Sequence, residues 1–190
     1  MLYSNKKNIF GGKRHTFLPC LPEGETIVHF IFGTDDLRLK ERLASLTSSY
    51  FADPRDPNVS TIIDNFDLSR LAMEINSMPF LASRRLVIVK NLLKAKGVDQ
   101  AKVIEIIDKA PNEVDLIFFE EGVPDQRTSL FKRLKREKTE EFRDLIGYEL
   151  NNWVADEIVR QGGTIKPQDA AMLAGYVGAD LWHLKMRSQS

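Results

Sequence analysis

Residues 26–36 read TIVHFIFGTDD, and this stretch sets the fold class of the 190-residue chain. Its first part, 26–32, is apolar, β-branched and aromatic, which is typical of a buried strand. The run stops at Gly33, and Asp35 or Asp36 can cap the helix that follows, where leucines recur at helical spacing. A buried strand, a glycine turn and a helix in this order indicate an α/β protein.

The same alternation continues to about residue 147. Further strands are predicted at 59–64, 85–90, 114–119 and 140–145, and helices at 67–78, 98–110 and 126–138. Helices between strands require right-handed crossovers, so we expect a parallel sheet with helices covering both faces. After Gly147 only helical patterns remain, at 149–160, at 166–176 and from 178 onward.

These patterns divide the chain into a tail (1–25), an α/β domain (26–147) and a small all-helical domain (148–190) that stops early. The tail contains Gly11-Gly12 and two prolines, and it has no acidic residue before Glu23. Its apolar residues are too interrupted for a secretory signal. A flexible tail or a wrongly chosen start site is the favoured interpretation, and a mitochondrial presequence is the alternative.

The composition excludes several classes of protein. Lys+Arg and Asp+Glu both number 27, so no net charge attracts the whole chain to nucleic acid or to a membrane. The single cysteine, Cys20, excludes an internal disulfide framework and a cysteine-based metal cluster. No apolar run approaches the roughly 20 residues that span a bilayer.

The turn at Gly33 stands where related folds bind phosphate, but it lacks the phosphate-binding residues. The phosphate-loop motif would need glycine, lysine and a hydroxyl at positions that hold Arg38, Leu39 and Lys40. The strand at 85–90 ends in Lys90, where an ATPase would place an acidic residue for magnesium. Glu120-Glu121 follows the next strand, and we interpret it as a solvated strand end. We therefore expect no ATP hydrolysis, no metal and no cofactor.

An apolar segment, Met78-Pro79-Phe80-Leu81, lies between a predicted helix and a predicted strand. Pro79 cannot donate a hydrogen bond and disfavours helix at Met78, which places Phe80 and Leu81 on a turn. Two interpretations remain open on pattern alone. The side chains fold back into the core, or they form a plug that enters a pocket on a partner.

Basic residues gather on the predicted helix at 126–138: Lys132, Arg133, Lys135, Arg136 and Lys138. Such a face can contact DNA phosphates. A solvated basic face, balanced by nearby glutamates, is the simpler interpretation.

From about residue 27 to 184 the chain resembles the delta subunit of the bacterial DNA polymerase III clamp loader. The similarity lies in IFGTDD (31–36), DNFD (64–67), SMPFLASRRLVIVKN (77–91), ELNNWV (149–154) with Gly162-Gly163, and LAGYVGADL (173–181). The resemblance implies an AAA+-like α/β domain without a functional phosphate loop, followed by a helical lid-like domain.

The resemblance also implies a function. Members of this family bind the sliding clamp and open it for loading onto primed DNA. In them, adjacent apolar residues before the third strand enter a pocket on the clamp. Phe80 and Leu81 occupy those places here, and Met78 is expected to assist.

The expected setting is the cytoplasm, without a membrane. The expected partners are the clamp, the other loader subunits and, indirectly, primed DNA. The chain would have no activity of its own within a DNA-directed DNA polymerase holoenzyme. It departs from the family in lacking the third, collar domain and in carrying the extra tail. The alternative is a divergent nucleotide-dependent ATPase or switch domain on the same fold.

Overall fold

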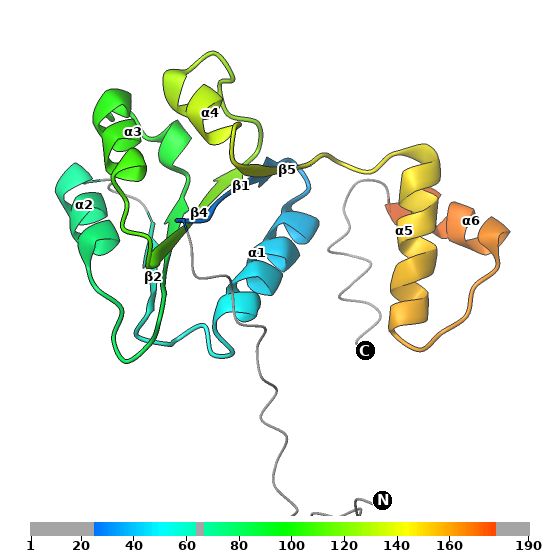
Figure 1. The fold of residues 1–190 in the computed structure, drawn as a ribbon. Helices are drawn as coiled ribbons and strands as arrows, with labels where there is room; N and C mark the ends of the chain where they lie inside the picture. Colours follow the sequence, from blue (N-terminus) through cyan, green and yellow to red (C-terminus); the bar gives the residue numbers. More distant parts are fainter. Residues whose placement is uncertain (1–24, 64–66, 178–190) are drawn as a thin grey trace, which may run out of the picture.

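The computed structural model describes residues 25–63 and 67–177, and it has a five-stranded parallel sheet at its centre (Figure 1). The strand order is β2-β3-β4-β1-β5, and every pairing is parallel. The strands are β1 (Val28–Gly33), β2 (Val59–Ile62), β3 (Arg85–Lys90), β4 (Val114–Glu121) and β5 (Lys138–Phe142). The predicted α/β class with a parallel sheet is confirmed.

Helices connect the strands and continue beyond the last one. They are α1 (Asp36–Tyr50), α2 (Leu68–Asn76), the short 3-10 helix η1 (Leu92–Lys94), α3 (Gln100–Asp108), α4 (Ser129–Leu134), α5 (Gly147–Arg160) and α6 (Pro167–Val177). Side chains cap four of them in the expected manner: Asp35, Asp67, Asp99 and Thr128 each accept a hydrogen bond from a backbone N–H of the first turn.

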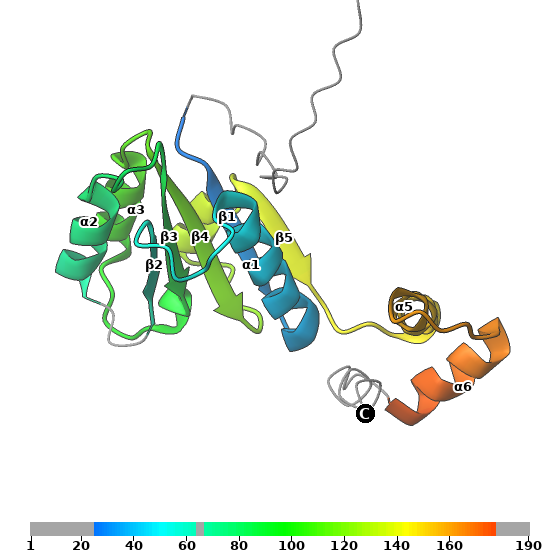
Figure 2. The same ribbon diagram turned by 90° about the horizontal axis from the view of Figure 1, so that it is seen from below.

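The strand order decides which face of the sheet each helix covers. The chain passes from β2 to β3, from β3 to β4 and from β4 to β5 in one direction, but from β1 to β2 in the other. Right-handed crossovers therefore place α2, α3 and α4 on one face and α1 alone on the opposite face (Figures 1 and 2). The prediction that helices cover both faces is confirmed for the face of α2, α3 and α4. On the opposite face α1 covers only part of the sheet.

The core follows this division. Phe30 and Phe32 of β1 point toward α2, α3 and α4, where both rings contact Phe131 of α4 edge-on. Ile31, between them in the sequence, points the other way and packs with leucines of α1 such as Leu39. This alternation is what a strand buried on both faces requires.

The boundaries around the last strand differ from the sequence prediction. The helix predicted at 126–138 extends only over α4, and the last strand begins at Lys138 rather than at residue 140. The physical reason is the sheet, because residues 138–141 pair with β1, and strand pairing replaces helical hydrogen bonds there. Lys135 is the C-cap of α4, so it and Arg136 lie outside the helical segment. The prediction that the basic residues share one helix is therefore wrong.

Helices α5 and α6 pack on each other beside the sheet (Figure 2). Leu150, Val154, Ala170 and Ala174 form their common core, and Leu37 of α1 joins it. The expectations for the tail before residue 25, for residues 64–66 and for a third helix from 178 lie outside the described residues. Within the part of the chain that the structure describes, no helix is long and apolar enough to cross a membrane.

Candidate functional site: the loop between α2 and β3

The loop of residues 77–84 carries the two most exposed large apolar side chains of the described residues, Leu81 and Met78, with Phe80 between them. Relative to full exposure, Met78 is 84% exposed, Phe80 62% and Leu81 93%. We call these three side chains the apolar tip. The interpretation in which they fold back into the core is wrong. Exposed neighbouring apolar side chains of this size are typical of sites that bind another protein.

The backbone of the tip is held in one conformation. Leu81 has a φ of 51°, in the left-handed region that a bulky residue enters at a cost of about 1–2 kcal/mol. The neighbouring Phe80 donates its N–H to Oδ1 of Asn58 at 2.6 Å, and its carbonyl accepts from Nδ2 of Asn58 at 2.9 Å. The side chains are thus exposed on a fixed main chain.

Two arginines hold the base of the same loop. Arg84 makes a bidentate ion pair with the fully buried carboxylate of Asp115, with both N–O distances at 2.6 Å. Arg85 bonds Glu74 of α2 at 2.6 Å. Asp115 also accepts the backbone N–H of Ile27 at 2.7 Å, so the loop is tied to the segment just before β1 as well. A tip on such a base loses little conformational freedom on binding.

The turn after β1, where related folds hold phosphate, is filled by the protein itself. Asp35 Oδ1 accepts the N–H of Arg38, and its N–H donates to the carbonyl of Phe142 at 3.1 Å. The Arg38 guanidinium bonds Asp35 Oδ2 and reaches the carbonyl of Arg143 at 2.6 Å. Two backbone donors at the start of α1, those of Asp35 and Arg38, therefore already have protein partners.

The ends of β3 and β4 likewise hold no acidic pair that faces solvent. Lys90 lies over the ring of Phe119, 5.4 Å from its centroid. Glu120 is fully buried and accepts the N–H of Leu93 at 2.8 Å, so the interpretation of Glu120-Glu121 as a solvated strand end is wrong for Glu120. Burial raises the pKa of Glu120 to about 7. Glu121 is half-buried, and Asn91 accepts its backbone N–H at 3.1 Å.

The basic residues of the predicted DNA-contact face have different surroundings. Arg133 is bound by Asp108 at 2.7 Å and also by Glu137, which leaves its charge largely neutralised. Lys135 lies 5.3 Å from the ring centroid of Phe32. Lys132 and Arg136 are exposed.

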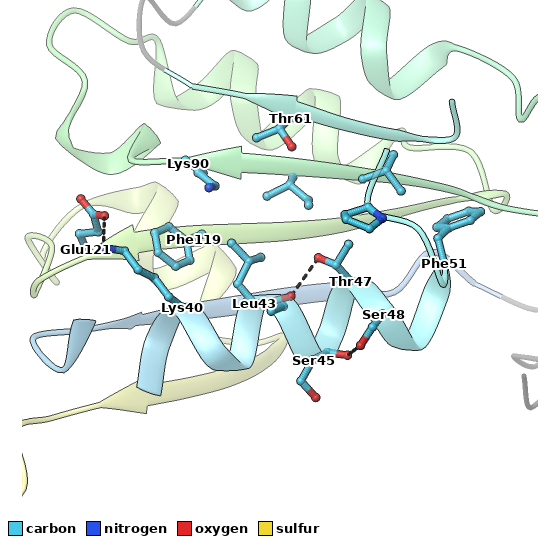
Figure 3. A pocket seen from close by; sticks show the side chains of 14 residues that line it. Lys40, Leu43, Ser45, Thr47, Ser48, Phe51, Thr61, Lys90, Phe119 and Glu121 are labelled. Atoms are coloured by element: carbon cyan, nitrogen blue, oxygen red, sulfur yellow. Dashed lines mark hydrogen bonds and ion pairs between the residues drawn. The ribbon is translucent and has the colours of Figure 1, made fainter. Parts of the chain in front are cut away.

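A pocket of about 700 Å³ opens on the face that α1 covers alone (Figure 3). Its floor is formed by β2, β3 and β4, through Val59, Thr61, Ile88 and Phe119, and α1 forms one wall. No single residue of the sequence indicates this pocket. The pocket follows from the strand order, because only one helical connection, α1, lies on this face and leaves part of the sheet uncovered.

The sheet order, the blocked phosphate turn and the projecting loop define the class of protein. This is a parallel α/β fold in which the turn after β1 is closed by Phe142 and the loop before β3 carries an apolar tip.

The family model described as DNA polymerase III, delta subunit, matches residues 29–142, which is more than half of the chain. The chain belongs to the delta subunit family of DNA polymerase III. No curated protein matches the sequence.

Two solved structures support the fold. The DNA clamp loader delta protein YqeN of Bacillus subtilis matches with a TM-score of 0.67 and 20% identity, over 87% of this chain and 52% of that one. A DNA polymerase III gamma subunit-related protein of Thermotoga maritima matches with a TM-score of 0.50 and 17% identity, over 86% of this chain and 57% of that one. The chain thus spans about half the length of the Bacillus protein.

Proposed function

We propose that this chain binds the sliding clamp through the apolar tip and helps to open the ring for loading onto primed DNA. The observation that carries the proposal is the tip itself: Phe80 and Leu81 are exposed side by side on a backbone that the rest of the molecule holds in place. Met78, at 84% exposure, extends the same apolar surface.

The free energy of burying these side chains is large enough to help open a ring. Burial of one phenylalanine and one leucine side chain in a partner's pocket contributes roughly 3–6 kcal/mol. That amount helps to hold a strained ring interface apart. The fixed main chain supports the proposal further, because little ordering is left for the moment of binding.

A non-catalytic role suits the rest of the structure. The turn at Gly33 is closed by Phe142, and β3 ends in Lys90 over an aromatic ring. Neither feature favours the alternative, a nucleotide-dependent ATPase or switch domain. The proposed role of the chain is then to bind the sliding clamp, within a loader whose other subunits hydrolyse ATP.

The remaining parts have proposed roles as well. Helices α5 and α6 belong to a helical lid-like domain, the chain meets other loader subunits, and the loader acts in the cytoplasm. The chain contacts primed DNA indirectly. If it touches DNA directly, Lys132, Lys135 and Arg136 are better placed than Arg133, which two carboxylates hold.

The test is retention of the sliding clamp of the same organism by the wild-type chain and by Phe80→Ala/Leu81→Ala. We expect the wild type to retain the clamp and the double variant to lose it. The matched control is Met172→Ala/Tyr176→Ala, which removes two exposed apolar side chains from α6 instead. Equal retention of the clamp by the wild type and by the loop variant would refute the role of the tip.

A further inference from the structure

We infer that Asn58 is a positioning residue for the apolar tip, whose buried amide sets the direction in which Phe80 and Leu81 face a protein partner. The inference rests on the proposed function, because the direction of the tip matters only if the tip binds. Nothing in the sequence pattern singles out Asn58. It lies in the loop before β2, 22 residues from Phe80.

The amide of Asn58 holds Phe80 at both of its backbone polar groups. Oδ1 accepts the Phe80 N–H at 2.6 Å, and Nδ2 donates to the Phe80 carbonyl at 2.9 Å. This two-point contact imitates the pairing of one strand residue with its neighbour. It restrains both the position and the rotation of the Phe80 main chain, whereas a single bond would act as a pivot.

The orientation of the amide is itself determined by a neighbour. Nδ2 also donates to Oδ1 of Asp56 at 2.9 Å, and the same oxygen accepts the Asn58 backbone N–H at 2.8 Å. A carboxylate can only accept, so the nitrogen of the amide must face Asp56. The oxygen is then left to accept from Phe80.

Asn58 also connects the tip to the sheet. It is only 3% exposed, and its backbone carbonyl accepts the N–H of Leu86 in β3 at 2.8 Å. The ion pairs of Arg84 and Arg85 hold the base of the loop, but Asn58 reaches the tip. The left-handed conformation of Leu81 directly follows the residue that Asn58 holds.

The consequence is a preorganised binding element. Without the amide of Asn58, the Phe80 main chain regains rotational freedom that must be lost again when the tip binds. We expect Asn58→Ala to raise the Kd for the sliding clamp about tenfold, with both apolar side chains still present.

The matched control is Asn76→Ala. Asn76 is an exposed asparagine at the end of α2, directly before the loop. Its side-chain amide donates to the carbonyl of Ala72 at 2.7 Å. Both variants remove the same atoms, but only Asn58→Ala frees Phe80. We expect the control to bind the clamp within about twofold of the wild type.

Two further measurements separate positioning from general destabilisation. Amide hydrogen exchange at residues 78–83 should accelerate in Asn58→Ala, while exchange in β3 and β4 stays slow at temperatures well below the Tm. A synthetic peptide of residues 76–86, which carries the tip without Asn58, should bind the clamp much more weakly than the whole chain.

The peptide keeps the inference testable if Asn58→Ala does not fold. In that case Asp56→Ala, which removes the oxygen that accepts from the Asn58 amide, gives a second route to the same loss of affinity. Wild-type affinity in Asn58→Ala with unchanged loop exchange, or a peptide as tight as the whole chain, overturns the positioning role alone. If Phe80→Ala/Leu81→Ala also binds like the wild type, the proposed function of the tip falls, and the role of Asn58 falls with it.

Discussion

The carbonyl oxygen of Phe142 occupies the space that any side chain at Gly33 would need. A Cβ placed on Gly33 would lie 1.9 Å from that oxygen, and the residue has a φ of 155°. In an ATP-binding relative of this fold the same region has to stay open for phosphate. Here the end of β5 fills it, so the loss of the phosphate-loop residues and the closing of the turn go together.

Gly33→Ala should destabilise the protein by about 3 kcal/mol or more, because either the backbone of β1 or that of residue 142 must shift. Urea unfolding gives the change in the free energy of unfolding. Gly97→Ala is the control: its φ of 75° is also positive, but nothing lies within 4 Å of a Cβ there. Equal losses in both variants would mean that the backbone angle, and not the contact with Phe142, accounts for the effect.

ATP should not bind this chain in a saturable, magnesium-dependent manner. The backbone donor of Asp35 is already bonded to Phe142, and the Asp35 carboxylate places negative charge where phosphate would lie. A titration with a fluorescent ATP analogue checks this, with an ATP-hydrolysing loader subunit as the positive control. Saturation at micromolar concentration that disappears with EDTA would revive the nucleotide-switch alternative.

Glu120 should make the stability of the protein depend on pH. Its pKa is raised to about 7 in the folded state, mainly by burial, so the folded protein binds a proton more readily than the unfolded chain. Its contribution is full below the ordinary carboxyl pKa and is lost as the pH rises through about 7. The total loss is up to about 3 kcal/mol.

Glu120→Gln should therefore flatten the decline of stability between pH 5 and 8, while the Gln carbonyl still accepts from Leu93. Unfolding in urea at several pH values measures the slope. Glu121→Gln is the control at the next position, where the side chain is 41% exposed. An unchanged slope in Glu120→Gln would show that another group titrates in this range.

The Arg84–Asp115 pair should be among the most costly polar contacts to break. Asp115 is fully buried and Arg84 is 11% exposed, so Asp115→Asn leaves a buried guanidinium without its counter-charge. We expect a loss of about 3 kcal/mol in the free energy of unfolding.

Asp108→Asn is the comparison for that pair. It breaks the bond from Arg133 to a carboxylate that is 50% exposed, and we expect less than about 1 kcal/mol. Chemical denaturation of both variants in parallel gives the two values. Similar small losses would mean that water replaces the carboxylate at Arg84.

Several features follow directly from the sequence. The strand at 85–90 is predicted with its true bounds, because a short apolar run between arginine and lysine permits only one placement. The sequence also places Phe80 and Leu81 on a turn and offers Asp35 as one of two candidate caps, but it leaves open whether the two apolar side chains are exposed.

Other features required distant partners. The helix predicted up to Lys138 ends at Leu134, because residues 138–141 pair with β1 and form β5. Glu120 looked solvated, yet η1 covers it and supplies a hydrogen-bond donor. Asn58 lies far from the tip in sequence and acquires its role only when β2 and β3 bring the two loops together.

The sequence by itself determined the alternation of strands and helices, the missing phosphate loop and the apolar pair in the loop, because hydrophobic period, capping and motif spacing are local properties of the chain. The tertiary structure alone decided that Phe142 closes the turn at Gly33, that α1 covers its face of the sheet alone and that Asn58 holds Phe80. Each of these depends on strand order and register, which bring together residues that no local pattern connects.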